Sequence, residues 1–224
     1  MKNTLNQIVY AKNAVEFVTV ANEYCKFIES ADAHSQKVFV NLALKLLPLL
    51  YLKASMLNET LAEFEDGLDE EGDFGTEIFV SEVEYYALET NIRTKLEDFN
   101  EYPDVYESQS VATNESTLCF ISEDLTDIYQ DLKNFTQNYR NGLEEVMVDS
   151  LFEANNQFKI YWGQRLVNTM RALHNIYFNG ELSAEEEAIE PEEVEDFDDE
   201  TTSKSNPNWL NDRFEDNTEN PFAV

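Results

Sequence analysis

Apolar residues recur at steps of three and four along most of the first 180 residues, and this spacing constrains the fold more than any other feature. The first such series contains Tyr10, Ala14, Phe17, Ala21, Tyr24 and Ile28. Such spacing places apolar side chains on one face of an α-helix, whereas a half-buried strand alternates at every second residue. The sequence therefore predicts a chain built from packed helices.

Two further helices are expected before residue 100. Residues 35–57 are apolar on most faces, so we expect them to form the central helix, with a kink where Pro48 removes an amide. Ser81 and Glu84 fit a capping box, in which the two side chains satisfy amides at the start of a helix. This helix is expected to end near Phe99.

Two more helices are expected between residues 121 and 179. One apolar stripe begins at Ile121, and Asn141 and Gly142 supply its stop signal. The next stripe begins at Leu143 and continues to residue 179, with a bend expected at Gly163 because that turn lacks a side chain.

The segments between these helices are expected to be loops. Residues 76–80 and 117–121 are strand candidates, but they are too short and too isolated for us to expect a sheet. Residues 65–75 and 103–116 are polar and contain glycine or proline, which is typical of loops. The predicted fold is therefore all-α, a single bundle of about five helices.

Charge divides the chain into two parts. The protein has 46 acidic and 15 basic residues, for a formal charge of −31, and residues 181–224 hold 16 of the acids and two of the bases. A segment so acidic and so poor in apolar residues cannot bury enough surface to fold alone. We therefore expect a helical domain at residues 1–180 and a disordered acidic tail at residues 181–224.

The same composition excludes several classes of function. An acidic protein lacks the basic surface that binds nucleic acid or anionic lipid, so neither is an expected partner. The apolar run at residues 38–52 is shorter than the roughly 20 residues of a membrane span, and it contains Asn41, Lys45 and Pro48. It is expected to be a core helix. The N-terminus has no apolar signal segment, so we expect a cytoplasmic protein.

Few residues carry recognisable chemistry. Cys25 and Cys119 are too few for a disulfide framework or a cysteine zinc site. A di-iron bundle needs Glu-x-x-His pairs, but Ala31 and Arg171 stand three residues before His34 and His174. No phosphate-binding or nucleophile motif is present. We therefore expect no metal, no cofactor and no catalytic residue, and we favour a protein that is not an enzyme.

One acidic stripe could meet basic residues of the last helix. Asp124, Asp127 and Asp131 follow each other at i, i+3 and i+7, and the last helix offers Lys159, Arg165 and Arg171. A structural ion-pair network between the two helices is the favoured interpretation. The alternative is a pocket that binds an anionic or planar small molecule between the last two helices, in a binding protein or an enzyme. Its candidate residues are Tyr129, Asp131, Tyr161, Trp162, Arg165 and His174.

The acidic tail also contains isolated apolar groups, which are Trp209, Leu210, Phe214 and Phe222. A solvated segment has no packing reason to keep them, so we expect them to dock either on the chain's own domain or on a partner. Acidic surface accelerates encounters with basic proteins. The favoured function is accordingly an adaptor that binds a basic protein partner through its acidic surface and its tail.

Four stretches resemble a known family: EFVTVANE at residues 16–23, LPLLYLKA at 47–54, DIYQDLK at 127–133 and YWGQ at 161–164. In order and spacing they are similar to the helical family called domain of unknown function 5063, typical of Bacteroidetes bacteria. The resemblance spans roughly residues 8–178 and omits the tail. It implies a helical fold and a cytoplasmic bacterial protein, and it brings no established activity or catalytic residue.

Overall fold

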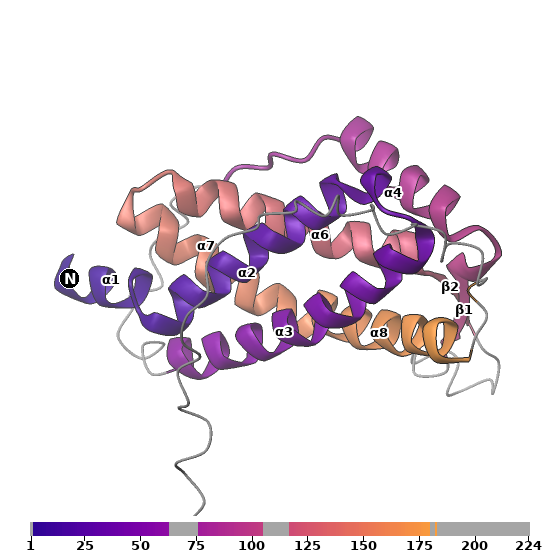
Figure 1. The fold of residues 1–224 in the computed structure, drawn as a ribbon. Helices are drawn as coiled ribbons and strands as arrows, with labels where there is room; N and C mark the ends of the chain where they lie inside the picture. Colours follow the sequence, from indigo (N-terminus) through magenta and orange to yellow (C-terminus); the bar gives the residue numbers. More distant parts are fainter. Residues whose placement is uncertain (1, 63–75, 105–116, 180–181, 183–224) are drawn as a thin grey trace, which may run out of the picture. The chain divides into compact units, whose positions relative to one another are not determined.

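The computed structural model describes residues 2–62, 76–104, 117–179 and 182 (Figure 1). Helices dominate this part of the chain, so the all-α expectation is confirmed. The elements, in chain order, are α1 (Lys2–Val9), α2 (Lys12–Glu29), η1 (Ala31–Ala33), α3 (Gln36–Ala62), α4 (Glu82–Leu96), η3 (Glu97–Asn100), β1 (Glu101–Asp104), β2 (Thr117–Phe120), α6 (Ile121–Arg140), α7 (Glu144–Gln157), η4 (Phe158–Trp162) and α8 (Gly163–Phe178).

The central helix is α6, which contacts α2, α4, α7 and α8. The expectation that residues 35–57 would be central is wrong: α3 packs mainly against α2 and α8, and it leaves Val38, Leu49 and Leu52 exposed. A helix can be surrounded on several sides when its polar side chains find partners in the interior. Helix α6 meets that condition, because buried polar residues such as Ser122 and Thr126 are hydrogen-bonded.

Aromatic side chains fill the core between α2, α6 and η4. The Phe17 ring lies 5.1 Å from that of Phe135 and 6.5 Å from that of Trp162, measured between centroids. Phe158 packs against Trp162 at 4.8 Å. Offset and tilted ring pairs of this kind add to the stabilisation that comes from burying their area.

Helix α3 continues through Pro48 without ending. By length and composition it could cross a membrane, and it is the one helix among the described residues of which this is true. Core helices of soluble proteins meet the same criterion. One third of its most apolar 18-residue window is buried, so part of its apolar surface faces outward.

Two predicted helix boundaries are confirmed. The Ser81 side chain accepts a hydrogen bond from the Glu84 amide at 3.2 Å, which is the N-cap of α4. Gly142 has a φ of +81° in the connection between α6 and α7, a conformation that glycine adopts without steric cost.

A small sheet corrects the expectation that no strands would pair. β1 and β2 are antiparallel, with Tyr102 opposite Cys119 and Pro103 opposite Leu118. Residues 103–116 were expected to form a loop because the segment is polar and begins with Pro103. A two-stranded ribbon nevertheless accepts proline, since each strand has an edge that needs no ladder hydrogen bond. Residues 76–80, the other strand candidate, form neither helix nor strand.

The long helix expected from Leu143 is interrupted by the π-helical turn η4 between α7 and α8. The expected bend at Gly163 falls directly after this turn. A Cβ atom at Gly163 would lie 2.4 Å from the backbone oxygen of Phe158, which no side chain tolerates. The wide turn and the missing side chain therefore occur together.

Residues 183–224 lie outside the described residues, and with them the tail candidates Trp209, Leu210, Phe214 and Phe222. Leu182, four residues after α8 ends, is described. It is buried and belongs to the same apolar core as the helices.

Candidate functional site

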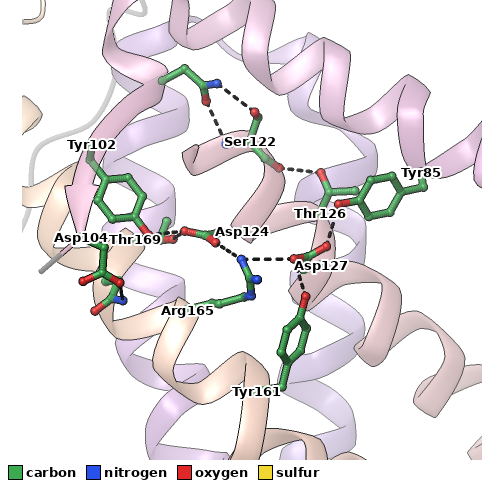
Figure 2. Close-up of polar contacts among 12 residues, drawn as sticks. Tyr85, Tyr102, Asp104, Ser122, Asp124, Thr126, Asp127, Tyr161, Arg165 and Thr169 are labelled. Atoms are coloured by element: carbon green, nitrogen blue, oxygen red, sulfur yellow. Dashed lines mark hydrogen bonds and ion pairs between the residues drawn. The ribbon is translucent and has the colours of Figure 1, made fainter. Parts of the chain in front are cut away.

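Asp124 of α6 lies at the centre of a buried polar network (Figure 2). Its side chain is 2% exposed. The Arg165 Nη1 atom donates to Oδ1 at 2.6 Å, and the Thr169 hydroxyl donates to Oδ2 at 3.0 Å. The Tyr102 hydroxyl also donates to Oδ2. This carboxylate thus joins α6 to β1 and α8.

Asp127, one turn later on α6, extends the network toward α4 (Figure 2). The Tyr85 hydroxyl donates to its Oδ1 atom at 2.6 Å, and the Tyr161 hydroxyl donates to Oδ2 at 2.7 Å. Arg165 Nη1 lies 3.4 Å from the same Oδ2 atom. The Arg165 guanidinium also lies over the Tyr161 ring, 4.6 Å from its centroid, a cation–π contact.

A second chain of hydrogen bonds connects α4, η3 and α6. The Ser122 hydroxyl donates to Glu89 Oε1 at 2.7 Å, and the Asn100 side chain donates to Ser122 Oγ at 3.0 Å. Arg93 forms an ion pair with the same Glu89 oxygen at 2.7 Å. The buried Glu89 carboxylate is therefore both paired and hydrogen-bonded, as buried charges must be.

Burial makes the largest single contribution to the pKa of Asp124 and of Arg165. It raises the pKa of Asp124 above the ordinary value of aspartate, although the hydrogen bonds from Tyr102 and Arg165 act in the opposite direction. Burial alone would lower the pKa of Arg165, but the hydrogen bond to Asp124 and the charges of Tyr161, Asp127 and Asp124 together outweigh burial and raise it. Because two carboxylates already balance Arg165, an anionic ligand would have to displace one of them.

Asp131, one further turn along α6, has a different environment. It lines a cavity of about 60 Å³ together with Thr76, Asn134, Ser150 and Glu153. Its Oδ2 atom is buried and has no hydrogen-bond partner among the described residues. Burial, followed by the charges of Asp127 and Glu153, raises the pKa of Asp131 to about 7. This cavity therefore combines open space with unbalanced negative charge.

Amide side chains of α6 hold residues 76–80 against one side of this cavity. Asn134 Oδ1 accepts from the Phe79 amide at 2.8 Å, and Asn138 Oδ1 accepts from the Glu77 amide at 2.9 Å. The Thr76 hydroxyl donates to Glu153 Oε2 at 2.9 Å. These contacts fix a segment that is neither helix nor strand, so the cavity has a defined wall.

The remaining candidates lie elsewhere. The Tyr129 hydroxyl lies 3.0 Å from both Glu29 Oε1 and Glu84 Oε1. Trp162 is fully buried in the aromatic core. His174 is at the surface, with its ring 4.6 Å from that of Phe178. The six predicted pocket residues are therefore spread over several places, although Arg165 and Tyr161 share a cation–π contact.

Comparison with known proteins shows the family to which this chain belongs. The model of the family described as domain of unknown function (DUF5063) matches residues 8–179. The chain belongs to this family. This match confirms the family resemblance that was inferred from four stretches of the sequence.

A solved structure from a Bacteroidetes bacterium is similar to this DUF5063 chain. It is the crystal structure of protein BF1032 from Bacteroides fragilis, which is 42% identical. The match covers 76% of this chain and 95% of that one, with a TM-score of 0.63. None of the curated proteins matches this chain. Neither the family nor the similar structure comes with an activity.

Two of the four family motifs contribute to the candidate site. DIYQDLK supplies Asp127 and Asp131, and YWGQ supplies Tyr161 of the network together with the glycine that follows the π-helical turn. Within the described ranges of this DUF5063 chain, no group of three or more His, Cys, Asp and Glu side chains is placed to hold a metal ion.

Sequence reasoning missed several members of this site. Tyr85 and Tyr102 reach α6 from 42 and 22 residues away, and no local pattern marks them. No local sequence pattern identifies Glu153 as a site residue either. Thr169 could have been found, because it follows Arg165 by four residues and so lies on the same face of α8.

Proposed function

We propose that this protein is a non-enzymatic interaction protein that binds a basic partner through the acidic surface of α6 and α7. The observation that carries the proposal is the buried Oδ2 atom of Asp131, which no described residue hydrogen-bonds, in a polar cavity that Glu153 also lines. A buried carboxylate without a partner is costly, and a cationic group would remove that cost.

The charge around the cavity favours a cation. Helix α7 carries four acidic residues and no basic one, which are Glu144, Glu145, Asp149 and Glu153. Such a surface attracts basic proteins and increases their association rate.

The size of the cavity favours a side chain over a whole small molecule. Ligand pockets usually measure about 300–1,000 Å³, whereas this cavity measures about 60 Å³. That space suits the head group of a lysine or arginine. We therefore infer that a basic residue of the partner enters the cavity and pairs with Asp131.

The test uses n-butylammonium, which has the charge and shape of a lysine side chain. Carboxyl-detected NMR of the full chain follows the titration of Asp131 as the compound is added. A cation within hydrogen-bond distance lowers a carboxyl pKa by about one unit or more, so we expect the pKa of Asp131 to fall on saturation.

Controls separate a specific site from a general salt effect. Neutral n-butanol and sodium chloride of equal ionic strength should leave the pKa of Asp131 nearly unchanged. Glu153→Gln should weaken the response, whereas Glu59→Gln, an exposed acid on α3, should not. An equal response to n-butanol, or none to n-butylammonium, would remove the support for the proposal.

A further inference from the structure

Helix α3 presents an apolar stripe to the surface. Val38, Leu42, Lys45, Leu49 and Leu52 follow each other at steps of four and three, and they therefore lie on one face. Leu42 is partly buried, and the other four side chains are exposed. This is the spacing by which one helix packs along another, and no described element covers it.

Grooves lie on both sides of this stripe. The larger has a volume of about 550 Å³, lies between α3 and α8, and is lined by apolar side chains such as Leu44, Met170 and Phe178. The other has a volume of about 430 Å³ and includes Leu42, Leu46 and Leu49. Lys45 borders both. The stripe and grooves, called here the α3–α8 surface, can receive apolar side chains of a bound helix.

The charge of the α3–α8 surface is opposite to that of the protein. Among the basic residues of α3 and α8, Lys53 is paired with Glu16 and Arg165 with Asp124 and Asp127, whereas Lys45 and Arg171 line the grooves. Lys45, Arg171 and His174 line the larger groove, and none of the described residues that line it is acidic. In the smaller groove, Glu23 is neutralised by its 2.7 Å ion pair with Lys26.

We propose that the α3–α8 surface binds an amphipathic helix of a partner protein that carries acidic side chains. The apolar face of that helix packs on the stripe and fills the grooves, and its acidic residues face Lys45, Arg171 and His174. This interaction is separate from the acidic cavity on α6 and α7, so the two surfaces recruit partners of opposite charge.

Charge disfavours a second copy of the chain as the occupant. Each copy has a formal charge of −31, which opposes association. Two α3 helices paired antiparallel along the stripe would also bring one Lys45 against the other, because Lys45 lies midway between Val38 and Leu52.

The test is fluorescence anisotropy of the full chain with a labelled model helix of about five turns. The helix carries leucine at i, i+3, i+4 and i+7, and glutamate on its remaining face. We expect saturable binding, at least about tenfold weaker for a helix in which lysine replaces the glutamates. Lys45→Glu should weaken binding of the acidic helix by a similar factor.

Matched exposed leucines serve as the control pair. Leu52 on the stripe is 51% exposed and Leu118 on β2 is 55% exposed, so serine at either position should leave folding intact. Leu52→Ser should weaken binding, and Leu118→Ser should not. Equal effects of the two variants, or no preference for the acidic helix, would overturn the proposal.

If the α3–α8 surface binds something else, the measurements differ, and each of the following results would also overturn the proposal. A concentration-dependent dimer in sedimentation that Leu52→Ser abolishes would assign the surface to a second copy. Stronger binding to phosphatidylglycerol vesicles than to the acidic helix would assign it to a membrane. Binding of the model helix only after Trp209 and Phe214 are replaced by serine would assign it to the acidic residues 183–224 of the same chain.

Discussion

Two aspartates of one helix, seven residues apart, have opposite environments. Asp124 accepts hydrogen bonds from Tyr102, Arg165 and Thr169, whereas a buried oxygen of Asp131 accepts none among the described residues. Hydrogen bonds and an ion pair therefore offset much of the cost of burying the carboxylate at position 124, whereas no described residue offsets it at the buried oxygen of Asp131.

Replacement of Asp131 by asparagine should stabilise the protein in a pH-dependent way. The pKa of Asp131 is raised to about 7 in the folded state, above its ordinary value of 3.8. Between these values the folded protein holds a proton that the unfolded chain releases, so stability falls as pH rises through this window. Asp131→Asn removes that penalty, and urea unfolding should show a gain of about 1–2 kcal/mol more near pH 8 than near pH 5.5.

The exposed acid Glu59 provides the control for this prediction. Glu59→Gln should leave the pH dependence unchanged, and Glu153→Gln should reduce it because the charge of Glu153 contributes to the raised pKa of Asp131. A variant Asp131→Asn that is less stable than the natural protein near pH 8 would contradict the assigned cause.

Replacement of Arg165 by methionine should destabilise the protein, in contrast to Asp131→Asn. It leaves the Asp124 carboxylate buried without its cationic partner, which should cost about 2–4 kcal/mol of unfolding free energy. The double variant Asp124→Asn/Arg165→Met should lose less than the sum of the two single losses, since the residues act as a pair. Thermal and urea unfolding of all three variants measures this coupling, and simple additivity would show that no such pair exists in solution.

Among the elements, the π-helical turn η4 links α7 to α8 at a position that requires glycine. Any Cβ atom at Gly163 would collide with the Phe158 carbonyl oxygen. The turn also places Trp162 in the core while Tyr161 reaches Asp127. A wide turn inside a helical segment thus changes which side chains face inward.

Gly163→Ala should destabilise the protein although alanine is the better helix former. The collision requires a backbone shift, for which we expect a loss of about 1–3 kcal/mol in urea unfolding. Ile160→Ala, at an exposed position of the same turn, should change stability by less than about 0.5 kcal/mol. Stabilisation by Gly163→Ala would show that the turn is regular α-helix in solution.

At the scale of the whole molecule, acidic and basic residues are segregated. Helix α7 has four acids and no base, whereas α3 and α8 together have five bases and one acid. Although the formal charge is −31, Lys45 and Arg171 therefore form a basic region beside exposed apolar side chains. Segregation of this kind permits simultaneous contacts with partners of opposite charge.

Repulsion among the excess acids should make stability depend on salt. Raising sodium chloride from roughly 10 mM to roughly 150 mM shortens the Debye length from about 30 Å to about 8 Å. Because 46 acids face 15 bases, we expect this screening to raise the melting temperature. Differential scanning calorimetry at neutral pH measures the change, and a lower melting temperature would mean that favourable ion pairs outweigh the repulsion.

The sequence by itself determined the helical class, several helix ends and the family, because each depends on residues close together in the chain. Apolar spacing, the Ser81 cap and the Gly142 stop act within about one or two turns. The tertiary structure alone decided that α6 is central, that Pro103 pairs in a strand and that Asp124 finds Arg165 41 residues away. Local sequence patterns show which side of a helix is apolar. The partner of a buried charge depends instead on how distant segments pack against each other.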